Sequence, residues 1–70
     1  MDYLVIVEKG ANSFGAYVPD LPGCVAAAES REEVLRLIRE AIAIHIEGLT
    51  ESGVAVPEPT SSVELVKISD

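Results

Sequence analysis

The side chains that could take part in chemistry are few and scattered in this 70-residue chain. They are three acids in predicted strands and turns, one histidine and one cysteine: Glu8, Asp20, Glu29, His45 and Cys24. A metal-dependent nuclease needs several carboxylates that converge on one point, and no spacing in the sequence forces the three acids together. A catalytic nucleophile needs a base or a charge that activates it. The sequence places no serine, cysteine or acid to work with the histidine.

We therefore expect structural roles for these residues. Cys24 enters an apolar segment with no cation or helix N-terminus nearby to lower the pKa of its thiol, so we predict a buried, unreactive side chain. His45 lies on the apolar face of a predicted helix, where we expect it to be packed and hydrogen-bonded or to lie in an interface with another chain. The sequence has no glycine-rich phosphate loop, no metal-spaced cluster and no aromatic stacking platform. We predict no enzymatic activity, no catalytic residue, no metal and no cofactor.

A stiff corner organises the first half of the chain: Pro19, Asp20, Leu21, Pro22, Gly23 and Cys24. The two prolines fix φ, and each favours an extended conformation in the residue before it. Pro22 and Gly23 fit the central pair of a type II turn, because glycine tolerates the positive φ required there. The Asp20 carboxylate is expected to accept a hydrogen bond from a nearby backbone N–H as an Asx turn.

Apolar segments on both sides of this corner predict a hairpin and a third strand. Residues 3–7 form a β-branched run that is apolar on both faces, which is typical of a strand covered on both sides. A turn at residues 10–13 leads to a second strand over residues 14–18. After the corner, residues 24–28 are assigned as a third strand, although alanine is a weak strand former.

A long amphipathic helix follows. Ser30 is a good N-cap, and Glu33 completes a capping box. The helix is predicted over residues 31–52, with Gly53 as a left-handed C-cap. Its apolar arc is wider than one sheet usually covers, so part of it is expected to meet another chain.

Residues 54–59 form a proline-stiffened connector, residues 60–62 a turn, and residues 63–68 a last strand. We therefore predict one α+β domain over residues 1–70, in the order βββαβ, with an antiparallel-rich sheet and one helix on one face.

Composition indicates self-association. The hydrophobic share is 49%, and the mean hydropathy of +0.31 is high for so short a chain. One helix leaves the second face of the sheet uncovered, so we expect a dimer or tetramer. The predicted interface residues are Leu4, Ile6, Leu35, Ile46, Val66 and Ile68.

The net charge of −7 argues against direct nucleic-acid binding, because phosphate contacts need clustered Lys and Arg. An acidic surface can attract a basic partner protein, or it can simply keep an apolar domain in solution. No apolar run reaches the ~18 residues of a membrane span, and the N-terminus lacks a signal-peptide pattern. With a single cysteine, we predict a cytoplasmic protein.

The order of these signals resembles the HicB-like antitoxin family over nearly the whole chain. The segments that carry the resemblance are the first predicted strand, the corner with the strand before it, the helix start, the helix centre, the helix end and the connector: residues 3–7, 15–24, 30–33, 40–49, 51–53 and 57–59. The resemblance implies that family's βββαβ core, often described as a partial ribonuclease-H-like fold. It also implies a non-enzymatic antitoxin of a type II system, which masks a small HicA-type RNA-cleaving toxin and self-associates.

Many members of that family carry a C-terminal DNA-binding domain. This sequence has only two residues after Ile68, so we expect no DNA binding by this chain. The main alternative is a stand-alone homo-oligomeric interaction or ligand-binding domain without a toxin partner. A vestigial nuclease is the third hypothesis.

Overall fold

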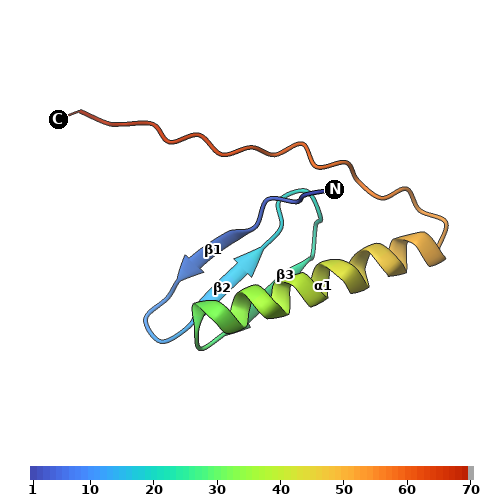
Figure 1. The fold of residues 1–70 in the computed structure, drawn as a ribbon, viewed down its shortest axis with the longest axis horizontal. Helices are drawn as coiled ribbons and strands as arrows, with labels where there is room; N and C mark the ends of the chain where they lie inside the picture. The colour runs from blue at the N-terminus through green and yellow to red at the C-terminus, as the bar shows by residue number, and fades with distance from the viewer. Residues whose placement is uncertain (70) are drawn as a thin grey trace.

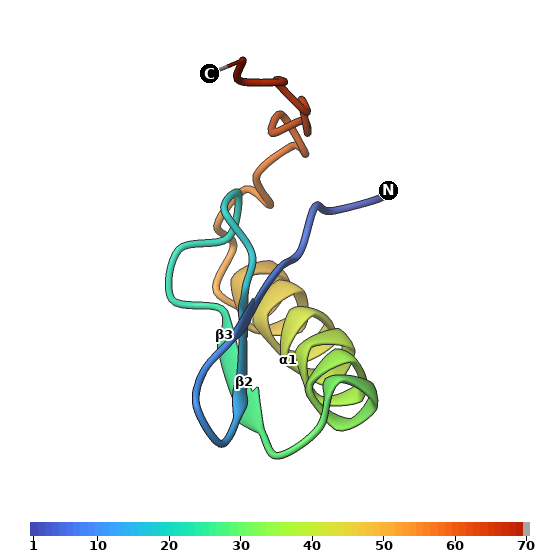
Figure 2. The same cartoon turned by 90° about the vertical axis from the view of Figure 1, so that its left-hand side faces the viewer.

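The computed structural model describes residues 1–69, in which three strands precede one helix (Figure 1). The elements are β1 (Ile6–Lys9), β2 (Phe14–Tyr17), β3 (Val25–Ala28) and α1 (Arg31–Glu51). The strands form one antiparallel sheet in the order β1-β2-β3. The helix lies across one face of this sheet, mainly over β3 and β2 (Figure 2). The predicted α+β class and the three antiparallel strands before the helix are confirmed.

The first hairpin is shifted relative to the sequence prediction. Strand β1 begins at Ile6 and extends to Lys9, beyond the predicted end at Val7. The turn is tight, because the N–H of Gly10 donates to the carbonyl of Ser13 at 2.7 Å. This turn pairs Lys9 with Phe14. The geometry of the turn therefore sets the register of the hairpin. It also brings polar residues into β1 that a prediction from the hydrophobic pattern leaves outside the strand.

The register divides the sheet into a covered and an open face, since neighbouring side chains on a strand alternate. Val7, Ala16 and Ala26 are cross-strand partners on the face that α1 covers. The next row, one residue along each strand, lies on the opposite face: Ile6, Tyr17 and Val25. The small core lies between the helix and the covered face, and its buried residues are Ala16, Val18, Leu21, Cys24, Val34 and Ile38.

Both ends of α1 are capped by groups close in sequence. The Oγ of Ser30 accepts a hydrogen bond from the N–H of Glu33 at 3.1 Å, and Glu33 adds negative charge to the first turn. At the other end, Gly53 has φ of +72° and its N–H donates to the carbonyl of Thr50 at 3.2 Å. The N–H of Val54 donates to the carbonyl of Leu49 at 2.9 Å. These two bonds form a Schellman motif, which ends the helix.

The corner between β2 and β3 is closed by three backbone hydrogen bonds. The N–H of Leu21 donates to the carbonyl of Val18 at 3.1 Å, and the N–H of Cys24 donates to the carbonyl of Leu21 at 3.0 Å. Gly23 has φ of +84°, as the third residue of a type II turn requires. The corner turns the chain and places Leu21 in the core with no exposed surface.

The strand predicted over residues 63–68 is wrong as a strand within this chain. Residues 54–69 are extended, but the structure assigns no strand partner to any of them. The radius of gyration is 14.0 Å, whereas a compact 70-residue domain has about 11 Å. Sequence pattern correctly gives the extended conformation, but a strand also needs a neighbour. Beyond residue 61 the chain leads away from the sheet (Figures 1 and 2).

Replacing Gly23 by valine should destabilise the fold through backbone strain. An added Cβ would meet no atom within 4 Å, so only the positive φ opposes the side chain. We expect a loss of about 1–3 kcal/mol in the free energy of unfolding, measured by urea denaturation. Gly15→Val is the matched control, because Gly15 also has open space around it and lies in a strand without a positive φ. Equal unfolding midpoints for the two variants would contradict the turn assignment.

Candidate protein-binding surface

The carboxylate of Asp20 ties the C-terminal segment to the corner. Its Oδ2 accepts hydrogen bonds from the backbone N–H groups of Thr60 and Ser61 at 3.1 and 3.0 Å. Its Oδ1 accepts from the hydroxyls of the same two residues at 3.0 and 2.9 Å. The N–H of Ser61 contributes most to lowering the pKa of Asp20 below its usual value, while partial desolvation opposes this shift. We call this arrangement the Asp20 clamp.

The sequence predicted a local Asx turn for Asp20, and this expectation is wrong. The carboxylate bonds to residues 40 and 41 positions away. The corner closes through its own backbone bonds, which leaves the side chain free for the distant segment.

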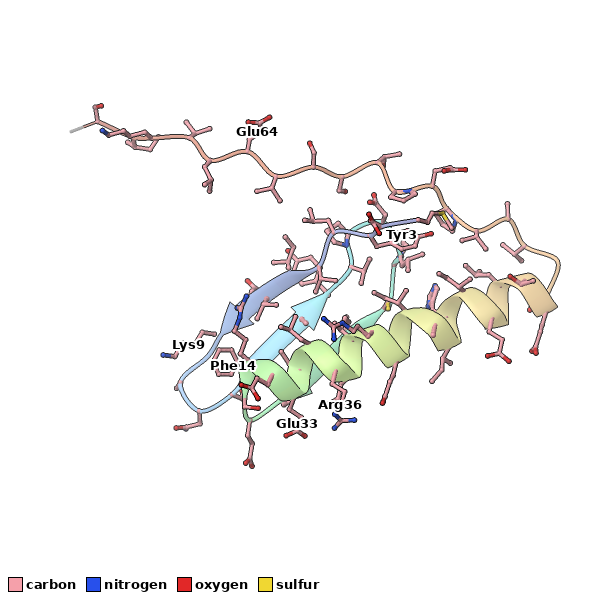
Figure 3. All side chains as sticks on the ribbon, viewed as in Figure 1. Tyr3, Lys9, Phe14, Glu33, Arg36 and Glu64 are labelled. Carbon is pink, nitrogen blue, oxygen red and sulfur yellow. The ribbon has the colours of Figure 1, made fainter. Side chains whose placement is uncertain are left out.

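A second contact holds the connector before the clamp. The hydroxyl of Tyr3 donates a hydrogen bond to the backbone carbonyl of Pro57, and Tyr3 lies below the connector in Figure 3. Pro57 and Pro59 stiffen the connector between α1 and the clamp. Together the two contacts fix where residues 62–69 leave the domain.

Residues 62–69, here called the C-terminal tail, expose their apolar side chains to water. The exposed fractions are 60% for Val63, 95% for Leu65, 75% for Val66 and 77% for Ile68. Figure 3 shows the tail lying apart from the sheet, with its side chains projecting on both sides. A run of such side chains is unusual on a protein that works alone.

The open face of the sheet is a second apolar area. Ile6, Tyr17 and Val25 lie side by side in the cross-strand register. Tyr17 and Val25 are 40% and 65% exposed, and Ile6 is half-buried. No helix covers this row in the part of the chain that the structure describes.

The second half of α1 carries an apolar side chain within a row of acids. Glu40, Ile44, Glu47 and Glu51 follow one another at helical spacing and so share one face of α1. We call this row the acidic stripe. Ile44 is 69% exposed, and the described last turn of α1 contains no Lys or Arg. The negative end of the helix dipole therefore adds to the glutamates.

The first half of the helix has a different electrostatic character. Arg36 Nη1 lies 3.3 Å from Glu40 Oε1, an exposed ion pair one turn apart. Ser30, Glu32, Glu33 and Arg36 line a shallow depression at the helix N-terminus, where Figure 3 labels Glu33 and Arg36. Glutamates already occupy the positive end of the dipole there, so this depression does not favour an anion.

The six residues predicted as an oligomer interface lie on four different segments. Leu4, Ile6, Leu35 and Ile46 are half-buried. Val66 and Ile68 are strongly exposed in the tail. Sequence reasoning did not select Tyr17, Val25, Ile44 or Leu65, although these side chains are at least as open to solvent as the first four. The cross-strand register, which gives the row on the open face, was the missing signal.

The fold does not bring together the side chains that were considered for catalysis or metal binding. Cys24 is only 3% exposed, and burial raises the pKa of its thiol. His45 is half-buried on α1. Among residues 1–69, no three His, Cys, Asp or Glu side chains are grouped so that they could hold a metal ion. In the same residues, no helix is both long and apolar enough to cross a membrane.

Comparison with protein families identifies a match over residues 3–70. The matching family is described as the HicB-like antitoxin of bacterial toxin–antitoxin systems. The match includes the corner, the helix and the tail sequence.

Individual relatives support the same grouping. The chain is 40% identical over 58 residues to a UPF0150 protein of Helicobacter pylori, covering 83% of this chain and 81% of that protein. It is 36% identical over 58 residues to the UPF0150 protein Ta0767 of Thermoplasma acidophilum, covering 81% and 84%. A 14.9 kDa protein from the rep–hol intergenic region of Haemophilus phage HP1 is 36% identical over 58 residues. That match covers 83% of this chain and only 44% of the phage protein.

A solved structure has the same fold. It is a chain of the HicA3 and HicB3 toxin–antitoxin complex, with a TM-score of 0.72 and 32% sequence identity. The similarity covers 86% of this chain and 70% of that chain.

Acid should open the Asp20 clamp. Because hydrogen bonding lowers the pKa of the folded carboxylate, the clamp is fully present above the usual pKa of 3.8 and is lost as the pH falls through the lowered value. We expect the amide proton shifts of Thr60 and Ser61 to stay constant from pH 7 to about 4.5 and to move to free-chain values below 3.8, as followed by ¹⁵N–¹H spectra.

Two controls isolate the clamp. Asp20→Asn should show free-chain shifts for Thr60 and Ser61 already at pH 7, because an amide cannot accept four hydrogen bonds with one oxygen. The N–H of Val54, which bonds to Leu49, should not move with Thr60 and Ser61 in either protein. A transition centred above pH 3.8 would contradict a lowered pKa.

Proposed function

The chain belongs to the HicB-like antitoxin family of bacterial toxin–antitoxin systems, and we propose that it is a non-enzymatic antitoxin that masks a HicA-type RNA-cleaving toxin. The observation that carries this proposal is the similarity, at a TM-score of 0.72 and 32% identity, to a chain of a toxin–antitoxin complex. On this proposal the chain acts in the cytoplasm, where such a toxin meets RNA.

Charge supports a basic partner. The chain has a net charge of −7, whereas a protein that binds RNA needs clustered Lys and Arg for the phosphates. Complementary potentials speed association and favour the correct partner. An antitoxin with this charge can therefore occupy the basic surface that the toxin would use for RNA.

We place the toxin contact on the acidic stripe of α1. Its acids can pair with basic side chains, and a cation there is also favoured by the negative end of the helix dipole. Ile44, 69% exposed between Glu40 and Glu47, supplies an apolar centre with a charged rim. This is the usual layout of a protein–protein interface.

Self-association is part of the proposal. The open face of the sheet and the tail together leave apolar side chains in water that a second copy could cover.

The direct test looks beside this chain's gene for a reading frame that encodes a short basic protein and uses that protein as the toxin, and a locus without one would contradict the antitoxin role. The purified chain should inhibit RNA cleavage by that toxin fully at a molar ratio of about one chain per toxin. Raising the salt concentration from about 50 to 500 mM should slow association while the complex persists, because screening weakens electrostatic steering. Failure to inhibit the toxin at any ratio would contradict the antitoxin role.

Variants of the acidic stripe then test the contact. Ile44→Asp should raise the Kd for the toxin about tenfold, equivalent to ~1.4 kcal/mol. Glu47→Lys should slow association, as expected for a charge at the rim. Glu58→Lys is the control, because it makes the same charge change at an exposed site on the connector, outside the stripe. If Glu58→Lys and Glu47→Lys behave alike, net charge matters and the proposed location is wrong.

A further inference from the structure

Within residues 1–69, three extended segments have a backbone edge without a strand partner: β1, β3 and the tail. In the described structure β1 pairs only with β2, so its outer edge presents free N–H and C=O groups. The tail has no strand neighbour within residues 1–69. An exposed edge and a free extended segment readily pair between chains.

The tail does not reach the β1 edge of its own copy. The hydrogen bonds from Tyr3 to Pro57 and from Thr60 and Ser61 to Asp20 set its exit from the domain. From this exit the tail and β1 diverge, as both views show (Figures 1 and 2). The contacts that anchor the tail therefore also direct it outward.

We propose that the tail of one copy adds as a strand to the β1 edge of a second copy, and that the two copies exchange tails reciprocally. One chain carries both the donor segment and the acceptor edge, so a two-fold pair satisfies both. The tail spans about 26 Å when extended, which is long enough to run along the whole of β1 and the extended residues before it.

The side chains of the tail suit the β1 edge better than the β3 edge. The tail is apolar on both sides, with Val63 and Leu65 on one and Val66 and Ile68 on the other. The β1 region also has large apolar side chains on both faces, with Val5 and Val7 toward the helix and Ile6 on the open face. Strand β3 ends in three alanines, which offer far less surface to an added strand.

Charge favours a second copy over a basic protein as the occupant. The tail contains one acid and one base, Glu64 and Lys67, and β1 also contains one of each, Glu8 and Lys9. Pairing these two neutral segments meets little net repulsion. A basic toxin would gain nothing from a neutral tail and would be attracted to the acidic stripe. This inference does not depend on the toxin proposed above.

The first test is the mass of the full-length chain between about 1 and 50 µM, measured by analytical ultracentrifugation. We expect a dimer that Val66→Asp weakens at least tenfold. Leu65→Asp, on the other side of the tail, should have the same effect. Val54→Asp is the matched control, because Val54 is also exposed, at 53%, but lies before the tail. The helical signal in circular dichroism should be unchanged in all three, since none of these side chains belongs to the core.

The second test identifies the contact. In a mixture of isotope-labelled and unlabelled copies, intermolecular nuclear Overhauser effects should connect residues 63–68 of one copy with residues 5–9 of the other. Three results would overturn the proposal. They are a monomer at every concentration, an oligomer equally stable in the Val54→Asp and Val66→Asp variants, and tail contacts to β1 that arise only within one copy.

Discussion

Four-residue strands are about 13 Å long, whereas the 21-residue helix that packs on them is about 30 Å long. The sheet therefore covers only part of α1. The two fully buried helix residues, Val34 and Ile38, both lie in its first half. In the second half Ile42, Ile46 and Leu49 are half-buried, and Ile44 is mostly exposed. This geometry buries six residues in the core and leaves the second half of the helix only partly covered by residues 1–69.

The corner lets such a short sheet form a core at all. Its backbone bonds place Leu21 and Cys24 in the interior, where they extend the apolar layer beyond the ends of the strands. The carboxylate of Asp20 then accepts hydrogen bonds from the segment that returns from the helix. These hydrogen bonds are at the surface, where water competes for both partners, so their net contribution to stability is modest. Their larger effect is on the direction of the tail, because they fix the two residues directly before it.

The parts of the fold that follow from local chemistry could be predicted from the sequence. The Ser30 cap, the helix end near Gly53 and the positive φ of Gly23 each depend on residues within a few positions of one another. The hairpin register could not be placed, because the pattern of residues 3–7 does not specify how the turn pairs Lys9 with Phe14. The partners of Asp20 lie 40 residues away, and no local pattern encodes that contact. The extended tail was predicted as a paired strand because a sequence pattern reports conformation and apolar character but does not say whether a neighbouring strand is present.

The two exposed surfaces of the domain, the acidic stripe and the tail, differ in position and in chemistry. The acidic stripe is exposed on α1. The tail leaves the domain elsewhere, beyond the N-terminal segment and β1 as seen from the helix (Figure 1). One surface is strongly acidic with a single apolar side chain, and the other is apolar with balanced charge. On the two proposals made above, these surfaces would take different partners, a basic toxin on the stripe and a second copy on the tail. Self-pairing through the tail would also bring two acidic stripes into one assembly. An assembly with two such sites has a higher effective affinity for a partner that presents two copies of its own basic surface.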